Sequence, residues 1–502
     1  MPKAPTSSKK DWFKDRGYLH LTNRINKKDK PKVLSYVSNP KLISKHRFSP
    51  FIFKAIKSRR FKFSDDFGKR SHKAVNEKGE IESNAKLRPI MYATHIDAHV
   101  YSYYAHEVIQ PKHEALLKAN SKLDESVTAY RRISTDEGVR FKYNVDFAKD
   151  VFDEIKKRKD CCALAFDIKN FFPSLNHQQL KRIWSEVLGT KSLPKDHYNI
   201  YKSITNFSYF YYNDLRVSKK GNLDEKKIAK LKNNGKFQFF GDMNDFLDSD
   251  IQIYKNQKKT DGKIAGIPQG LPISALLANI YMLPFDRQII SDLVEKKNCF
   301  YRRYSDDLVV VCKAEDVNEV ENFVMNEIKK IKLDISPSKT EKFRFKTENN
   351  QLKCFKIEND KYIPNAYLQY LGFDFYGDKI LIKSANISRF YREMKESIRM
   401  KNKRVEKVQE KYLTDDRIIY KRKIIRLFSF KGEKSRLLPA KKQVFRNGKL
   451  ETDYFDRKYR GNFIKYAYRA SDIMEAPEIR RQVRRHYIIL KDYMRKFGFD
   501  NI

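Results

Sequence analysis

The chain has 502 residues, of which 40% are hydrophobic and 13% aromatic, so it is not a largely disordered chain. At this length two to four subdomains are expected. Lys and Arg number 105 against 63 Asp and Glu, a net charge of +42, which predicts a nucleic-acid partner ahead of an anionic membrane surface. No apolar run approaches the roughly 20 residues that span a bilayer, and the N-terminus lacks the apolar core of a secretion signal, so we expect a cytoplasmic protein without membrane partners.

The five cysteines predict no metal site. Cys161, Cys162, Cys299, Cys312 and Cys354 show neither CxxC spacing nor a nearby histidine pair, so zinc is not expected. We interpret them as core residues in a reducing compartment.

The N-terminal part of the chain is strongly basic. Residues 1–60 carry 17 Lys and Arg against three Asp, and we expect a small, partly helical region there. Lys86 and Arg88 follow in a predicted strand, where side chains alternate with period two, so both cations share one face. Two cations on one exposed face suit a triphosphate. Helices are predicted from His95 onward and over 145–157.

An acidic residue closes a buried strand in the next segment. Residues 161–168 (CCALAFDI) read as an apolar strand with Asp167 at its end. A carboxylate in that position indicates a site more than packing, because unpaired buried carboxylates are costly. Residues 190–262 are interpreted as a long polar insertion, with 227–234 as a surface loop.

Two turns carry the remaining chemistry. Gly266–Ser274 (GIPQGLPIS) fixes a turn where backbone can approach a ligand closely, with Ser274 as a helix N-cap. Phe300–Cys312 predicts a hairpin of two strands, 300–304 and 308–312, around Ser305, Asp306 and Asp307. Taken alone, Ser-Asp-Asp fits an ordinary polar turn as well as a metal site.

The last part of the chain changes composition. Residues 385–502 contain 33 Lys and Arg against 15 Asp and Glu. We predict helices over 389–411, 417–428, 463–473 and 476–497. Together they indicate an all-helical basic domain.

The acidic sites and the cationic strand together fit two-metal phosphoryl transfer. That reaction needs carboxylates that hold two metal ions about 3.5–4 Å apart, and cations that hold the phosphates. Mg²⁺ prefers oxygen ligands, with Mn²⁺ as the alternative.

Six motifs in this order resemble the fingers and palm motifs of reverse transcriptases. They are KLRPI, AFDIKNFFPSLNH, GIPQGLPISALLANIYM, YSDD, SPSKT and YLQYLGF, spread over roughly residues 80–380. The resemblance implies an α/β (α+β) right-hand polymerase with an antiparallel palm sheet. The implied segments are 1–85, the basic N-terminal region and start of the fingers; 86–160, the fingers; 161–384, the palm with an insertion at 190–262; and 385–502, an all-helical basic domain in place of a thumb.

The resemblance also implies roles for individual residues. The catalytic carboxylates would be Asp167, Asp306 and Asp307. The ligands of the two Mg²⁺ ions would be Asp167, Ile168, Asp306 and Asp307. The substrate-binding residues would be Lys86, Arg88, Phe172, Gln269, Gly270 and Lys339. Phe172 would exclude the ribose 2′-hydroxyl, which implies dNTP use, although it also fits a plain core position.

Within that family, the chain resembles the bacterial defence-associated, abortive-infection type. This resemblance implies a homo-oligomer that acts in antiphage defence, copies a noncoding RNA or makes DNA without a template from a protein primer, and so takes dNTPs and nucleic acid as partners. Two alternatives stay open: a retron-like or group II intron-like reverse transcriptase, and a non-catalytic RNA-binding protein on a polymerase fold.

Overall fold

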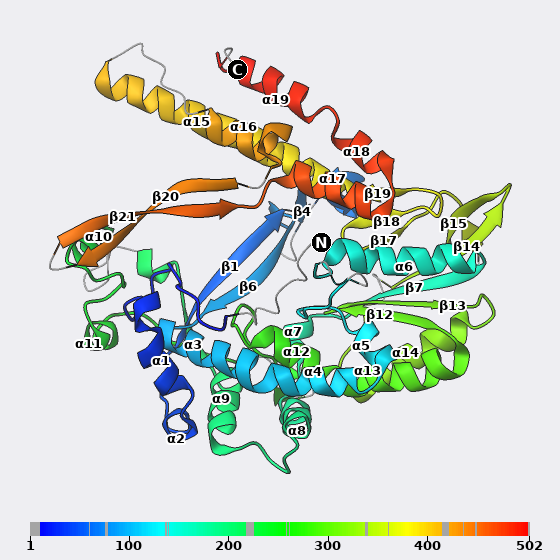
Figure 1. Ribbon diagram of the computed structural model, residues 1–502, viewed down its shortest axis with the longest axis horizontal. Helices are drawn as coiled ribbons and strands as arrows, with labels where there is room; N and C mark the ends of the chain where they lie inside the picture. Colours follow the sequence, from blue (N-terminus) through cyan, green and yellow to red (C-terminus); the bar gives the residue numbers. More distant parts are fainter. Residues whose placement is uncertain are drawn as a thin grey trace.

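The two largest β-sheets of the described residues, one of six strands and one of four, are surrounded by helices (Figure 1). The computed structural model describes residues 11–59, 61–75, 79–135, 138, 140–216, 225–257, 259–260, 262–336, 340–359, 361–413, 421–434, 436–446 and 449–499. The mixed α/β class expected from the sequence is confirmed. None of the helices in these ranges is both long and apolar enough to cross a membrane.

The larger sheet has six strands and is antiparallel throughout. Its order is β12-β13-β7-β14-β15-β16. The strands are β12 (Phe300–Tyr304), β13 (Asp307–Cys312), β7 (Cys161–Asp167), β14 (Glu341–Glu348), β15 (Gln351–Glu358) and β16 (Lys361–Ile363). The predicted strand at 161–168 and the predicted hairpin at 300–312 are therefore confirmed.

Both faces of the central strands β7 and β13 are buried. On one face lies α6 (Asn144–Arg158), whose apolar residues recur at helical spacing and pack on Ala163, Val309 and Val311. The other face meets α13 (Leu283–Ile289) and α14 (Val317–Lys330) (Figure 1). The alternate residues Leu164, Phe166, Leu308 and Val310 point to that second core. A strand that is apolar on both faces is typical of such a central position.

The smaller sheet draws its strands from distant parts of the sequence. Its order is β6-β1-β8-β9, with β6 (Ala85–Tyr92), β1 (Phe51–Arg59), β8 (Ser208–Tyr211) and β9 (Tyr254–Lys255). Strand β1 pairs with β6 antiparallel along eight residues and with β8 in parallel. The sheet therefore joins the N-terminal region, the Lys86–Arg88 strand and the 190–262 segment.

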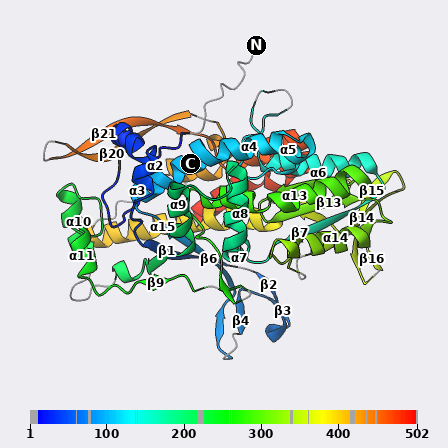
Figure 2. The same cartoon turned by 90° about the horizontal axis from the view of Figure 1, so that it is seen from below.

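Helices and short hairpins surround the two sheets. On the sequence before β7 lie α1 (Lys30–Val37), α2 (Pro40–Ile43), α3 (His95–Tyr103), a π-helical stretch (Tyr104–Ile109), α4 (Gln110–Lys118) and α5 (Ser121–Ser126). After β7 come α7 (Phe171–Ser174), α8 (His177–Leu188), α9 (Lys195–Thr205), α11 (Met243–Leu247), α12 (Ser274–Tyr281) and a second π-helical stretch (Ile290–Glu295). The hairpins β2 (Lys62–Ser64)–β3 (Lys69–Ser71) and β4 (Lys73–Val75)–β5 (Ile81–Ser83) project from the body (Figure 2), and β10 (Lys259–Thr260) pairs with β11 (Lys263–Ile264).

One expectation for the 190–262 segment is wrong. Residues 227–234, expected as a surface loop, lie mostly in α10 (Glu225–Asn233). Its sequence, EKKIAKLKN, consists largely of strong helix formers, so local propensity explains the helix.

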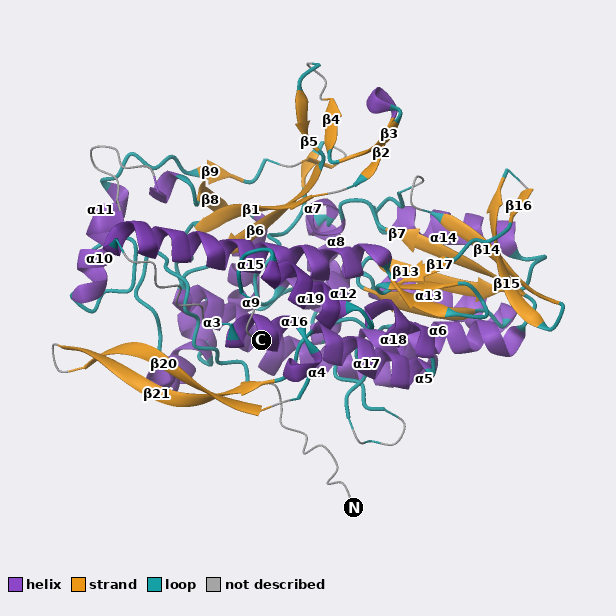
Figure 3. Cartoon of the chain, turned by 90° about the horizontal axis from the view of Figure 1, so that it is seen from above, coloured by secondary structure: helices purple, strands orange, loops and turns teal. Residues whose placement is uncertain are grey.

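The C-terminal region is not all helical, which corrects the prediction. It contains α15 (Ser384–Tyr412), α16 (Arg422–Phe428), α17 (Phe463–Met474), α18 (Pro477–Val483) and α19 (His486–Arg495), but also the paired strands β20 (Arg436–Arg446) and β21 (Lys449–Tyr459). These strands project from the opposite side to β2–β5 (Figure 3). The sequence Asn447-Gly448 between them is a typical hairpin signal, which the all-helical interpretation overlooked.

The C-terminal helices share one core with α6 and the six-stranded sheet. Phe390, Met394 and Ile398 of α15 join that core, as do Ile464 and Ile479 of the last helices. A small sheet of β17 (Leu368–Tyr370), β18 (Phe373–Phe375) and β19 (Ile380–Ile382) links the two parts. The C-terminal region is thus packed onto the larger sheet.

Candidate active site

The Ser305–Asp306 turn is held tightly at the end of the larger sheet. Tyr304 and Asp307 are paired, so the hairpin loop has only two residues. Ser305 takes a positive φ of 63°, a conformation that suits such short turns. The N–H of Ile168 donates to the carbonyl of Asp306 at 3.2 Å, which fixes the turn against the strand that carries Asp167.

The structure brings the predicted carboxylates together. Asp167 and Asp307 are register partners across β7 and β13, so their side chains leave the same face of the sheet. Asp306 lies next to them in the turn. Its pKa is raised above the usual value, first because burial disfavours the charged form and also because the negative charge of Asp167 is close.

Lys86 belongs to the same site, although it comes from the other sheet. Its positive charge acts against the rise in the pKa of Asp306, so the start of β6 lies near that carboxylate. Arg88 lies on the same face of β6, and its Nη1 donates to Ser58 Oγ at 2.9 Å. Both cations are exposed, which leaves them accessible to an anionic ligand.

The glycine-rich turn connects the two sheets. The N–H of Ile267 donates to the carbonyl of Phe172 at 3.0 Å, and the N–H of Met91 in β6 donates to the carbonyl of Gln269 at 2.8 Å. Gly270 has a φ of +110°, and a Cβ there would lie 2.9 Å from Ile90 Cγ2 and 3.0 Å from the Met91 carbonyl. Only glycine fits that approach of the turn to β6.

Phe171 and Phe172 differ in burial. Phe171 is buried, whereas Phe172 packs against the core while part of its ring stays exposed. Phe172 also lies in α7, directly after β7 and beside the Gly266–Gly270 turn. A partly exposed aromatic ring in that place is available to touch a ligand.

Three expectations concern residues that the structure treats differently. Lys339 lies outside the described residues. Ser274 is not the N-cap but the first residue of α12, and its hydroxyl donates to the carbonyl of Pro268 at 2.5 Å. Ile168 has a buried side chain without ligand atoms, so only its backbone oxygen could bind a metal ion.

A buried ion pair beneath the turn was missed from the sequence. Arg303 is fully buried and binds Asp286 through Nε and Nη2 at 2.8 and 2.6 Å. Its Nη1 donates to Asn279 Oδ1 at 3.0 Å and to the carbonyl of Ser305 at 3.2 Å, and Tyr301 donates to Asp286 at 2.8 Å. The signal was present, because Asn279 and Asp286 are polar residues inside the apolar run ALLANIYMLPFD.

The carboxylates fit a magnesium site that substrate completes. Within the described residues, no group of three or more His, Cys, Asp and Glu side chains is arranged to hold a metal ion. Mg²⁺, however, is commonly held by one or two carboxylates together with substrate phosphates, and it keeps several waters. The pair Asp167 and Asp306 offers such oxygen ligands.

The family comparison identifies the segment that contains these turns. Residues 222–375 match the model of the family described as reverse transcriptase (RNA-dependent DNA polymerase). The matched segment includes Gly270, Asp306 and Asp307, whereas Lys86 and Asp167 precede it. No curated protein matches the sequence.

Among solved structures, telomerases show a distant likeness. Apo telomerase from Candida tropicalis, truncated from its C-terminal domain, is 13% identical with a TM-score of 0.37, over 71% of this chain and 60% of that chain. Telomerase from Candida albicans in complex with a TWJ fragment of telomeric RNA is 10% identical with a TM-score of 0.37, over 96% of this chain and 71% of that chain. This chain therefore spans less than two thirds of the first telomerase. Similarity at this level does not establish a shared activity.

Proposed function

We propose that the chain, whose residues 222–375 match the reverse transcriptase family, is an RNA-directed DNA polymerase that joins dNTPs to a growing DNA strand at Asp167 and Asp306. The observation that carries this proposal is the convergence of three groups from distant parts of the sequence. Asp167 ends β7, Asp306 lies in the β12–β13 turn, and Lys86 comes from the other sheet. Carboxylates opposite a cation are the parts that phosphoryl transfer requires.

Each group has a definite task in that reaction. Asp167 and Asp306 hold Mg²⁺, with Asp307 as the neighbouring third carboxylate and the Ile168 carbonyl as a further oxygen. When bound there, the metal ion lowers the pKa of the primer hydroxyl and neutralises negative charge on the phosphates. Lys86 and Arg88 orient the triphosphate, and Lys339, as its motif implies, contributes a positive charge there.

The glycine-rich turn and Phe172 shape the nucleotide pocket. Gln269 and Gly270 bring backbone close to β6, where the base and sugar of the incoming nucleotide are to be positioned. Phe172 narrows the space beside the sugar and excludes a ribose 2′-hydroxyl. The substrate is accordingly dNTP.

The decisive experiment compares the wild-type protein with Asp306→Asn. Purified protein receives Mg²⁺ and radiolabelled dNTPs, with an RNA template and DNA primer in one arm and without added nucleic acid in the other. We expect wild-type product in at least one arm and a loss of at least about a thousand-fold in the variant, as when a main electrostatic group of an active site is removed. Asp250→Asn, an exposed aspartate in the 190–262 segment, is the matched control and should keep full activity.

Two results would contradict the proposal. One is equal product from the wild type and Asp306→Asn. The other is no product from the wild type in either arm. The second result would favour the non-catalytic RNA-binding alternative, which the excess of Lys and Arg also supports.

The biological purpose proposed for the product is defence against phage. It rests on the resemblance to abortive-infection reverse transcriptases and on the basic C-terminal region, which suits a noncoding RNA template or protein-primed DNA, and it includes a homo-oligomeric assembly. Cells that express the wild type should plate phage less efficiently than cells that express Asp306→Asn, and light scattering should give a mass above one chain. Equal plating would instead leave the retron-like or intron-like alternative.

A further inference from the structure

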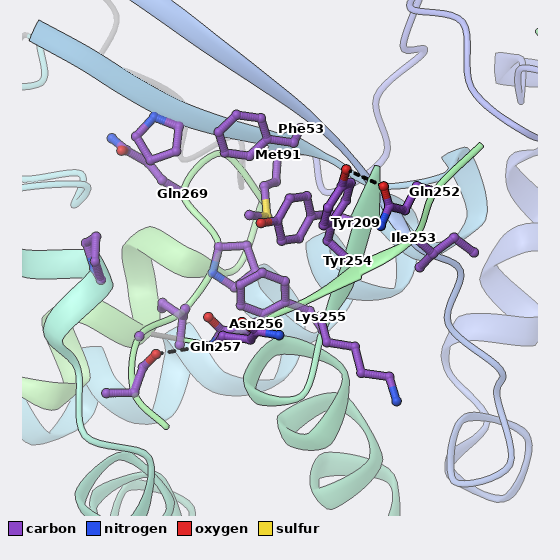
Figure 4. A pocket seen from close by; sticks show the side chains of 17 residues that line it. Phe53, Met91, Tyr209, Gln252, Ile253, Tyr254, Lys255, Asn256, Gln257 and Gln269 are labelled. Atoms are coloured by element: carbon purple, nitrogen blue, oxygen red, sulfur yellow. Dashed lines mark hydrogen bonds between the residues drawn. The ribbon is translucent and has the colours of Figure 1, made fainter. Parts of the chain in front are cut away.

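A cavity of about 640 Å³ opens between the smaller sheet and the glycine-rich turn (Figure 4). This volume lies within the range of small-ligand sites. Its walls come from β1, β6, β8 and β9 and from the turn at 265–269. The roles proposed for the catalytic carboxylates and for Lys86 leave this cavity unused.

One face of the smaller sheet carries a row of aromatic rings. Phe53 and Tyr211 are register partners across β1 and β8, and Tyr209 and Tyr254 are partners across β8 and β9, so all four side chains leave the same face. Tyr209 and Tyr254 are stacked with centroids 5.7 Å apart, and the Phe53 ring lies 5.4 Å from that of Tyr209. Phe53, Tyr209 and Tyr254 all line the cavity.

These rings are only partly taken up by the core: Phe53 and Tyr209 pack against it and still stay partly exposed. The opposite face of the same strands, through Ile52 and Phe210, is fully buried against Leu21 and three phenylalanines: Phe239, Phe240 and Phe246. The aromatic face is only partly covered, and Tyr211 is 37% exposed. Several aromatic rings gathered on an open face indicate a binding surface.

Amide side chains surround the rings. Gln252, Asn256, Gln257 and Gln269 all border the cavity. Gln252 accepts a hydrogen bond from the Tyr254 hydroxyl at 2.8 Å, and Asn256 Nδ2 donates to the carbonyl of Ala265 at 3.2 Å (Figure 4). Amides both donate and accept, as base edges do, whereas a hydrocarbon ligand would need neither.

The rest of the sheet face is cationic. Beyond Phe53, the same face of β1 carries Lys57 and Arg59, both exposed. Pro89 and Met91 of β6 line the cavity on this face, whereas Lys86, the register partner of Ser58, leaves the opposite face. The link to the catalytic site is Pro173, which lines the cavity and lies in α7, the helix that follows Asp167 and β7, so a strand of nucleic acid bound at the catalytic site also reaches the cavity.

We propose that this cavity stacks an unpaired base of the RNA template strand just outside the catalytic site. An aromatic face on a four-stranded sheet is a known way to stack bases of single-stranded RNA. A base must be unpaired and unstacked from its neighbour to lie on such rings. The phosphates of the same strand then bind to Lys57 and Arg59 at the end of this face. The assignment of the bound strand as a template rests on the proposed polymerase function. Base stacking in the cavity is independent of that function.

The test uses the full-length protein and a short single-stranded RNA that carries 2-aminopurine, whose fluorescence falls when it stacks on an aromatic ring. We expect quenching on binding to the wild type. Tyr254→Ala should bind roughly ten-fold more weakly and lose the quenching, since one base–aromatic stack accounts for about 5- to 150-fold in affinity. Tyr254→Phe keeps the ring and should behave as wild type.

Asp306→Asn separates this proposal from the proposed function, because it should bind the RNA with unchanged affinity and quenching whether or not it polymerises. A second measurement needs no variant: RNA that carries 4-thiouridine should crosslink to the wild-type protein at peptides that contain Tyr209 or Tyr254. Unchanged binding by Tyr254→Ala, crosslinks confined to other regions, or equal competition by fully paired RNA would overturn the base site. Tighter binding of single-stranded DNA than of RNA would overturn its assignment to the template.

Discussion

The two sheets of this protein hold their functional side chains in contrasting ways. In the six-stranded sheet both faces of the central strands are buried, and Asp167 and Asp306 emerge only at one end, above the fully buried Arg303. In the four-stranded sheet one face is buried and the other presents partly exposed rings and cations.

The contrast follows from what each sheet has to do. Groups that surround a reacting phosphate must be fixed in advance, because misplacement by about 1 Å weakens catalysis strongly. A surface that holds a moving strand of nucleic acid gains from open rings and long cationic side chains, which accept any base. The Gly266–Gly270 turn bonds to Met91 of β6 and to Phe172 of α7, the helix that follows β7, and therefore links the open surface to the segment behind Asp167.

The largest effect is expected from breaking the buried ion pair. Arg303→Leu leaves Asp286 charged and unpaired in the core, and we expect a loss of about 3–5 kcal/mol in the free energy of unfolding. The carbonyl of Ser305 also loses its donor. Polymerase activity should therefore fall by more than the fraction of unfolded protein accounts for. Urea unfolding and nucleotide incorporation at low temperature measure the two effects.

Two further variants give this prediction its controls. Arg287→Gln breaks the exposed pair with Glu186 and should cost no more than about 1 kcal/mol. The double variant Arg303→Leu/Asp286→Leu removes both charges and should regain stability but not activity. If Arg303→Leu were as stable as the Arg287→Gln control, the buried pair would not support the catalytic turn.

The next effect concerns the place where the two sheets meet. Phe172 follows β7, and its carbonyl accepts a hydrogen bond from the turn that docks on β6. Phe172→Val opens space beside the sugar, and we expect incorporation of rNTP relative to dNTP to rise roughly ten-fold or more, within the range that loss of a few apolar atoms produces. Competition between labelled dNTP and rNTP gives the ratio directly.

Phe171 is the matched control, because it is the buried neighbour of Phe172. Phe171→Leu should lower stability by roughly 1 kcal/mol or more, as core substitutions do, and should leave the sugar preference unchanged. An unaltered dNTP-to-rNTP ratio in Phe172→Val would return Phe172 to a plain core role.

The larger sheet could be foreseen from the sequence because its signals are local. An apolar run that ends in Asp167, and a two-residue turn between two β-prone runs, identify β7 and the β12–β13 hairpin without reference to the rest of the chain. Antiparallel pairing then places Asp167 beside Asp307.

The smaller sheet could not be foreseen, because its pairing is not local. Strand β8 lies about 150 residues after β1, in a segment that reads as an insertion, and only the structure shows Tyr211 beside Phe53. The run NFSYFYY shows many aromatics, but not that alternate rings go to a core and to an open face. The Arg303–Asp286 pair was missed for a similar reason, since neither residue reveals its partner.

Acid should also distinguish the two sheets. The N-terminal segment packs on the four-stranded sheet, where His20 Nε2–H donates to the Tyr92 carbonyl at 3.0 Å, and burial lowers the pKa of His20 to about 4. In the unfolded chain the pKa of this histidine is near 6.5, so between pH 6.5 and 4 the unfolded chain binds a proton that the folded chain does not bind. Stability is therefore full above about pH 6.5 and falls as the pH drops toward 4, by about 1.4 kcal/mol per pH unit for this histidine.

The strands of the six-stranded sheet contain no histidine, so hydrogen exchange should accelerate in residues 11–21 and in β6 before it does in β7 and β13. His20→Gln should flatten the pH dependence in that window, whereas acid-induced exchange that began in β7 would show that the two sheets do not differ in this way.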